Sequence, residues 1–256
     1  DRSSAASDVY KRQEDTYEVD GQPYFGHLRG RYSKAELKQI DAYAAAHGMQ
    51  VIPCIQTLAH VNALFHWPVY REIRDAADIL LTGDERTYAL VDGMFRTLRE
   101  CLRTNIVNIG MDEADLLGLG KYLTLHGYRD RFSILMEHLR RVSEMAKKYG
   151  FELLMWGDMF FRLAGGDYFT NFNQNPELGE IPEEVRQLVP ENIHLVYWDY
   201  FSRDRQSYER NIDAHNAIKS GSWFAGGLWT WAGFAPHNTF SIATMREAMK
   251  ACHAKG

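Results

Sequence analysis

Short apolar segments alternate with longer amphipathic segments along this sequence, and the alternation is what most restricts its fold. Short apolar segments bounded by turn residues are typical of buried strands, whereas apolar residues at helical spacing are typical of helices. Strands that are separated by helices pair in parallel through right-handed crossovers. The alternation therefore predicts an α/β fold with a parallel sheet.

The pattern gives residue ranges for most of these elements. The predicted strands are Met49–Gln56, Asn105–Met111, Phe151–Trp156, Ile193–Trp198 and Trp223–Trp231. The predicted helices are a segment that opens at the capping box Ser33–Glu36 and runs to Ala46, then Thr87–Arg103, Tyr128–Tyr149, Arg205–Lys219 and Ser241–Ala254. Pro53 predicts a bulge or an early end in the first strand. The number of units exceeds that of a small doubly wound domain. We therefore expect a (β/α)8 TIM barrel that is truncated at both ends, with a doubly wound sheet as the alternative.

Composition excludes several classes of partner. The chain has 256 residues with a formal net charge of −5, which argues against binding to nucleic acid or to a membrane surface. No apolar run approaches the roughly 20 residues of a membrane-spanning helix. The three cysteines, Cys54, Cys101 and Cys252, are isolated, and this favours a reducing compartment such as the cytoplasm.

Two adjacent acids, Asp112 and Glu113, follow the predicted strand Asn105–Met111, and Gly110 allows the backbone to turn there. α/β folds place their chemistry at the carboxyl ends of parallel strands. Adjacent carboxylates resist joint ionisation, so one of them is driven towards its protonated form. A protonated acid beside an ionised one is what acetal cleavage requires. The alternative is a helix N-terminus, where the helix dipole favours acids.

Polar and aromatic residues also follow the other predicted strands. These residues are His60, Trp156, Asp158, Trp198, Asp199, Tyr200, Trp229 and Trp231. In a barrel the carboxyl ends of the strands meet at one face, so we expect a single pocket there. Each residue also has an ordinary explanation, as a surface histidine, a core tryptophan or an aspartate that caps the next helix. Metal-ligand spacings, phosphate loops and nucleotide motifs are missing from the sequence, so we expect no metal and no cofactor.

The segment Val107–Ala114 (VNIGMDEA) resembles the catalytic motif of family-20 glycoside hydrolases, the exo-β-N-acetylhexosaminidases. Segments 14–19 and 23–33 are similar to the family's second strand end and its loop. Segment 52–60 is similar to the third strand, and 224–237 to the seventh strand and its loop. The resemblance covers most of the chain and is to the branch without large accessory domains, often intracellular in bacteria.

The resemblance implies that terminal β-linked GlcNAc or GalNAc is removed with retention, by attack of the sugar's own 2-acetamido oxygen on the anomeric carbon. Asp112 would hold the acetamido N–H, and Glu113 would act as general acid and then as general base. His60 would tune this acid through a relay with Asp15. The residues implied to contact the sugar are Trp156, Asp158, Trp198, Tyr200, and Trp229 or Trp231.

Some of the family's pattern has no counterpart in the sequence, namely an arginine on the first strand and an aromatic and an acidic residue on the last. Residues 1–13 are polar and without periodicity, and 8–13 resembles a translated DNA-library adapter. We therefore expect a non-native, disordered leader, followed by a partial barrel catalytic domain over 14–256. A barrel opened in this way exposes strand edges, which predicts that the chain alone is poorly stable and nearly inactive.

Two other functions stay open. The first is a barrel glycosidase with a separate carboxylate nucleophile, for which Asp158 and Asp199 are the candidates. The second is a non-catalytic sugar-binding relic, against which the intact pair of Asp112 and Glu113 argues. In each case the expected partner is a carbohydrate, and a homodimer is left open.

Overall fold

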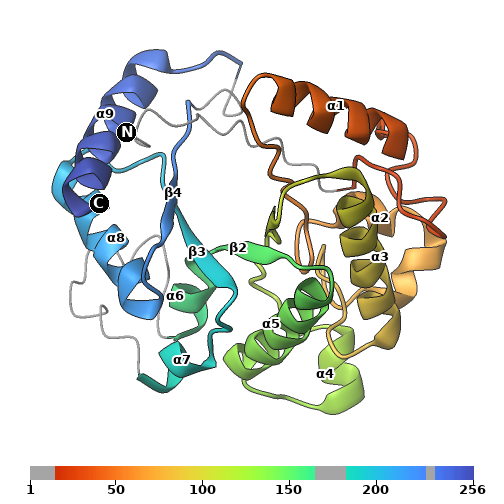
Figure 1. Ribbon diagram of the computed structural model, residues 1–256. Helices are drawn as coiled ribbons and strands as arrows, with labels where there is room; N and C mark the ends of the chain where they lie inside the picture. The colour runs from red at the N-terminus through yellow and green to blue at the C-terminus, as the bar shows by residue number, and fades with distance from the viewer. Residues whose placement is uncertain (1–14, 165–182, 229–233) are drawn as a thin grey trace. The chain divides into compact units, whose positions relative to one another are not determined.

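The computed structural model describes residues 15–164, 183–228 and 234–256 (Figure 1). The chain divides into two compact units: unit 1 comprises residues 1–154 and 190–193, and unit 2 comprises residues 155–189 and 194–256. Trp229, Trp231 and the expected leader lie outside the described residues, so the predictions made for them stay predictions.

Unit 1 is built on a short parallel pairing of strands. Strand β1 (Ile106–Asn108) pairs with β2 (Glu152–Trp156), and Val107 lies opposite Leu153. Both of these residues are completely buried, as is typical of a parallel strand that is covered on both faces. The chain leaves unit 1 within β2, after Leu154.

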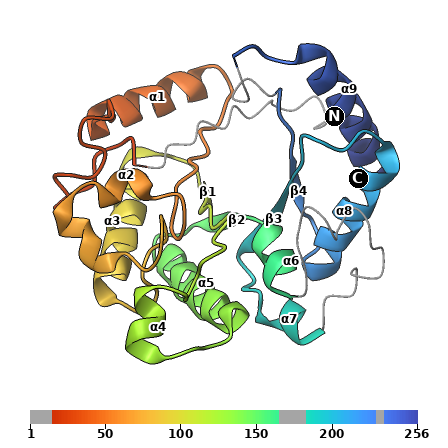
Figure 2. The same cartoon turned by 180° about the vertical axis from the view of Figure 1, so that it is seen from behind.

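Helices cover this part of the sheet. Helix α3 (Glu85–Cys101) lies beside α5 (Arg131–Lys148), and α1 (Lys34–Ala46) packs against α3 (Figure 2). Ser33 caps α1 in a complete capping box with Glu36. Along α3 the side chains that face the core recur at every fourth position: Leu90, Met94 and Leu98. The shorter helices of unit 1 are α2 (Asn62–Phe65), the 3-10 helix η2 (Pro68–Ile73) and α4 (Lys121–His126).

Unit 2 repeats the pattern with its own strands and helices. Strand β3 (Ile193–Trp198), which enters this unit at His194, pairs in parallel with β4 (Trp223–Ala225). Helices α8 (Arg205–Ile218) and α9 (Asn238–Lys255) lie side by side (Figure 1). The core between them includes the buried rings of Tyr197 and Tyr208. The remaining helices of this unit are α6 (Asp158–Ala164) and α7 (Glu183–Leu188).

The predicted α/β fold with parallel pairing is confirmed, and most predicted strands and helices are present. Three strand predictions were wrong in extent. Asn105–Met111 is reduced to β1 (Ile106–Asn108). Met49–Gln56 forms only an isolated parallel bridge from Cys54 to Asn108, because Pro53 has no N–H to donate and interrupts the ladder. Strand β4 ends at Ala225, before the predicted Trp231. Helix α1 ends at Ala46 and α8 begins at Arg205, as predicted. Helices α3, α5 and α9 begin two or three residues from the predicted starts, because the capping residues Asp84, Asp130 and His237 set these starts. In the part of the chain that the structure describes, no helix is long and apolar enough to cross a membrane.

His138 of α5 links the segment before His60 to helix α3 through two hydrogen bonds. Its Nε2 lies 3.0 Å from the Thr57 carbonyl oxygen, and its Nδ1 lies 3.2 Å from the Tyr88 hydroxyl. Because the carbonyl can only accept, Nε2 carries the proton and Nδ1 accepts from the hydroxyl. Burial lowers the pKa of His138 from 6.5 to about 4, so the imidazole is neutral in the folded protein.

This pKa predicts a pH-dependent stability. Between pH 6.5 and 4 the unfolded chain binds a proton at His138 that the folded chain does not, so the free energy of unfolding falls as the pH drops through this window. The contribution is at most about 3 kcal/mol. Urea unfolding at pH 7.5 and pH 5 measures it. We expect His138→Gln to reduce the change in the free energy of unfolding between these two pH values. The exposed control His47→Gln should leave that change as it is in the wild type. An identical slope in His138→Gln would contradict the assignment.

Candidate active site

A sharp turn follows β1 and carries the two adjacent acids. Gly110 has a φ of 71°, and the non-glycine residues Met111 and Glu113 also have positive φ values of 68° and 53°. The Gly110 N–H donates to Asn108 Oδ1 at 2.9 Å, which closes the turn. A left-handed non-glycine residue costs on the order of 1–3 kcal/mol, and such strain gathers at functional sites. The strained turn therefore marks the end of β1 as a candidate site.

His60 brings the two acids together. Its backbone is also left-handed, with a φ of 59°. Its Nε2 lies 3.3 Å from Asp112 Oδ2 and 3.4 Å from Glu113 Oε2. On the other side of the ring, Nδ1 lies 3.6 Å from Asp78 Oδ2. A single imidazole therefore faces three carboxyl groups and can hold or pass a proton among them.

The two acids differ in their surroundings. The Asp112 side chain is 3% exposed, whereas that of Glu113 is 39% exposed. Gln56 Nε2 donates to Asp112 Oδ1 at 3.1 Å. Buried carboxylates need donors of this kind to stay ionised, whereas an exposed carboxyl group can exchange protons with a ligand or with water. Asp112 is therefore the better candidate for a fixed negative charge, and the more exposed Glu113 is the better candidate for a proton that exchanges.

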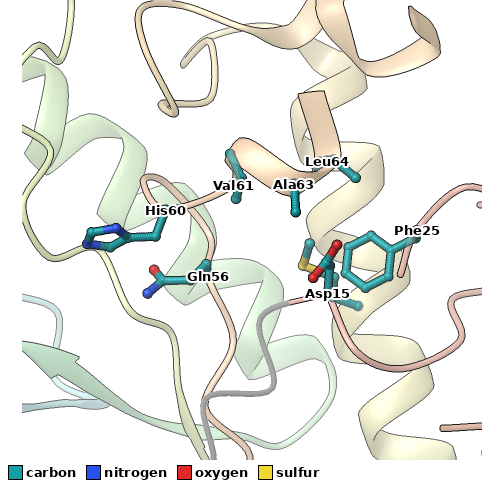
Figure 3. Close-up of a pocket in the computed structure, with 8 residues that line it drawn as sticks. Asp15, Phe25, Gln56, His60, Val61, Ala63 and Leu64 are labelled. Carbon is teal, nitrogen blue, oxygen red and sulfur yellow. The ribbon is translucent and has the colours of Figure 1, made fainter. Parts of the chain in front are cut away.

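The predicted relay from His60 to Asp15 needs correction. The carboxylate that faces His60 Nδ1 is Asp78, while Asp15 Oδ1 lies 2.9 Å from Arg29 Nε. Both Asp15 and His60 line one small pocket, but the imidazole points away from Asp15 (Figure 3). Burial raises the pKa of Asp15, and the Arg29 guanidinium opposes that rise. Asp78 lies nearer because its carbonyl accepts from Val61 N, which holds its loop beside His60.

The other expected contact residues belong to unit 2. Trp198 Nε1 donates to Asp158 Oδ1 at 3.4 Å, and the rings of Trp198 and Tyr200 lie 5.5 Å apart. Asp158 is completely buried and its Oδ2 lies 3.2 Å from Arg162 Nε. Trp156 is buried, as is Trp198. Unit 2 thus joins an aromatic pair to an ion-paired aspartate, and the roles of these residues in sugar binding stay predictions.

Asp199 is a structural residue of the loop that follows β3. Its Oδ1 accepts from Phe201 N at 2.7 Å and from Ser202 N at 3.0 Å, and its Oδ2 accepts from the Tyr197 hydroxyl at 2.6 Å. The alternative that Asp199 caps the following helix is wrong, because Asp204 caps α8. These donors hold the carboxylate within the loop, which does not favour a nucleophilic role.

Gln56 and Asp78 were not singled out by the sequence patterns. The pattern places Gln56 at the end of a predicted strand, and a polar side chain at a buried strand end is a signal that could have identified it. Asp78 lies in an irregular loop whose approach to His60 depends on tertiary contacts. A contact between an irregular loop and a distant histidine leaves no periodic pattern in the sequence, so the sequence could not predict it.

His60, Asp112 and Glu113 each place one ligand-type atom within 4.8 Å of the others. A metal ion could be held by three such atoms. We assign none, because the same separations suit an imidazole that shares its proton with two carboxyl groups. The absence of a metal stays a prediction.

At the end of a parallel strand, the structure places a buried carboxylate, a more exposed acid and an imidazole that contacts both, which are the kinds of group that acid–base catalysis uses. Residues 6–254 match the model of the glycosyl hydrolase family 20 catalytic domain. The chain therefore belongs to this family, as the sequence predicted.

Individual relatives agree with this family. Hexosaminidase D of Bos taurus is 27% identical over 250 residues, which cover 91% of this chain and 64% of that protein. The chain thus spans less than two thirds of the bovine relative. The β-N-acetylhexosaminidase of Bacteroides fragilis shares its fold, with 18% identity and a TM-score of 0.55 over 80% of this chain and 40% of that one. A mutant Streptomyces plicatus β-hexosaminidase in complex with GlcNAc has 18% sequence identity and a TM-score of 0.53. The match covers 87% of this chain and 44% of that one.

Asp75 fixes the loop that follows Glu113. Its Oδ2 accepts from Gly118 N and its Oδ1 from Tyr122 N, both at 2.8 Å, and the residue is 8% exposed. Asp75 also precedes Asp78 by three residues. It therefore connects the loop that carries Asp78 to the loop that follows Glu113, and both of these acids face His60.

We expect Asp75→Asn to destabilise the protein by about 1–3 kcal/mol, because an amide oxygen cannot replace two carboxylate acceptors and its NH₂ would face a buried N–H. Urea unfolding measures the loss, and limited proteolysis between residues 114 and 120 should become faster. Asp213→Asn is the control, since Asp213 pairs with Lys255 at the surface. Unchanged stability of Asp75→Asn would contradict this role.

Proposed function

We propose that the protein to which this chain belongs is an exo-β-N-acetylhexosaminidase that removes terminal β-linked GlcNAc or GalNAc with retention and with participation of the substrate's acetamido group. The observation that carries the proposal is the meeting of His60 with Asp112 and Glu113 at the strained turn. Family membership and the bound GlcNAc in the Streptomyces plicatus structure support it.

Asp112 acts on the acetamido group. As the acetamido oxygen attacks the anomeric carbon, positive charge develops on the nitrogen of the forming oxazolinium ring. A buried, ionised carboxylate that accepts the acetamido N–H stabilises this charge more strongly in the transition state than in the ground state. The side chain of Asp112 is buried and accepts from Gln56, so it suits this role.

Glu113 acts on the leaving group. It donates a proton to the glycosidic oxygen in the first step and takes one from water in the second. Its greater exposure gives it access to both the aglycone and the solvent. His60 contacts both acids, so its charge can follow the proton that Glu113 loses and regains, with Asp78 facing the far side of the ring.

The complete catalytic domain would be a closed (β/α)8 barrel, with its sugar-contacting aromatics at the carboxyl ends of the later strands. Trp156, Asp158, Trp198, Tyr200 and Trp229 or Trp231 would then bind the acetamido group and the sugar ring. That residues 1–256 alone are nearly inactive stays a prediction, so the experiments use the natural polypeptide that carries these residues.

The proposal is tested with matched aryl β-N-acetylglucosaminide and aryl β-glucoside substrates. We expect turnover of the first and none of the second, because the glucoside lacks the attacking group. Turnover of both would contradict acetamido participation and favour a separate nucleophile. Turnover of neither would favour a sugar-binding relic.

Variants separate the two acids. Asp112→Asn should lower kcat by roughly 100-fold with activated and with poor leaving groups alike, since it acts on the acetamido side of the reaction. Glu113→Gln should cost most with poor leaving groups, because these need protonation. Equal losses for Glu113→Gln on both kinds of substrate would overturn its role as general acid. Circular dichroism and thermal melting confirm that the variants fold.

A further inference from the structure

Gln56 is a buried polar residue that contacts Asp112, the first of the two adjacent acids. It is 2% exposed and lies between Ile55 and Thr57, which are both completely buried. The backbone around it is fixed, because Ile55 N donates to Asn108 O at 2.8 Å and Thr57 N donates to Ile109 O at 3.2 Å. The side chain therefore leaves a rigid segment at a defined place.

The contact with Asp112 sets the orientation of the Gln56 amide. Nε2 lies 3.1 Å from Asp112 Oδ1. A carboxylate only accepts hydrogen bonds, so the donor end of the amide must face it. Asp112 is thus held on two sides, by Gln56 at Oδ1 and by His60 at Oδ2. This pairing fixes the carboxylate plane.

The turn is shaped around the same amide. A Cβ at position 110 would lie 2.1 Å from Gln56 Oε1 and 2.7 Å from its Cδ. Gly110 is therefore required for two independent reasons, its left-handed φ and the space that the Gln56 side chain occupies. The glutamine and the strained turn form one packed unit.

Stability alone does not account for a glutamine at this position. A buried amide loses its hydration, and an apolar side chain of the same length would avoid that cost. Gln56 makes its side-chain hydrogen bond to a carboxylate that is itself buried, so a polar pair is kept in the core. Such pairs are retained where a precise geometry matters.

We propose that Gln56 is a positioning residue that holds the Asp112 carboxylate in the orientation needed to accept the acetamido N–H of the substrate. This inference rests on the proposed function and deepens it. Gln56 does not touch the reacting atoms, and its effect passes through Asp112. It also supplies an N–H without sharing a titratable proton with Asp112.

The test uses Gln56→Met, which keeps the length of the side chain and removes the donor. We expect kcat for aryl β-N-acetylglucosaminides to fall roughly 10- to 100-fold, which is typical for loss of a hydrogen bond to a charged group. The loss should be equal for activated and poor leaving groups, and KM should change less than kcat. Gln56→Glu should not restore activity, because a second carboxylate repels Asp112.

Gln50→Met is the matched control. Gln50 is exposed and lies six residues earlier in the same segment, and it donates to Thr104 Oγ1 at 2.8 Å, before the start of β1, whereas the acids follow the end of β1. We expect its kcat to match that of the wild type. A comparable loss in both variants would show that the loss of kcat does not depend on the contact with Asp112, and would overturn the proposal.

A double-mutant cycle with Asp112→Asn tests whether Gln56 acts through Asp112. In the Asp112→Asn background, Gln56→Met should cost less than about twofold. An undiminished loss in that background would overturn the proposal.

Crystal structures of the wild type and of Gln56→Met give a readout that does not depend on turnover. We expect the Asp112 carboxylate to rotate or to occupy several conformers in the variant, while the Ile55 and Thr57 backbone stays in place. An Asp112 in the wild-type position would overturn the proposal. If the wild type hydrolyses no N-acetylhexosaminide, the proposed function fails, and these two structures alone decide whether Gln56 positions Asp112.

Discussion

The arrangement of this site depends on one imidazole, that of His60, which contacts two adjacent acids. His60 lies beside both Asp112 and Glu113, and the backbone is left-handed at His60 itself and at Glu113. Other features serve the same contact: Gly110 opens space for Gln56, His138 holds the Thr57 carbonyl, and Asp75 fixes the loop that follows the acids. Strain that would destabilise an ordinary turn is offset here by packing and buried hydrogen bonds.

The asymmetry of the two acids follows from this arrangement. Adjacent carboxyl groups would share similar environments on a flat surface, but the turn buries Asp112 and leaves Glu113 more exposed. Gln56 and His60 both contact the buried Asp112, whereas the more exposed Glu113 is accessible to a leaving group and to water. A division of labour between a fixed charge and a mobile proton is what acetamido-assisted hydrolysis requires of its two acids.

The sequence predicted the parallel α/β fold and the acids because both depend on local patterns. Strand β3 had the predicted bounds, and Ser33 capped α1 as the pattern indicated. What the sequence did not predict depends on tertiary contacts. Pro53 reduced a predicted strand to a single bridge, and the partner of His60 proved to be Asp78, which reaches it from a loop without periodicity. Gln56 was missed because its importance lies in the register of its segment against β1.

The central claim is that the substrate's acetamido oxygen is the nucleophile and that Asp112 and Glu113 serve it. A series of aryl glycosides whose N-acetyl methyl group carries increasing numbers of fluorine atoms tests this directly. Fluorine withdraws electrons from the acyl oxygen and weakens it as a nucleophile. We predict that kcat/KM falls steeply and continuously along the series. A kcat/KM that is independent of fluorination would show that the acetamido group does not attack, and would contradict the account.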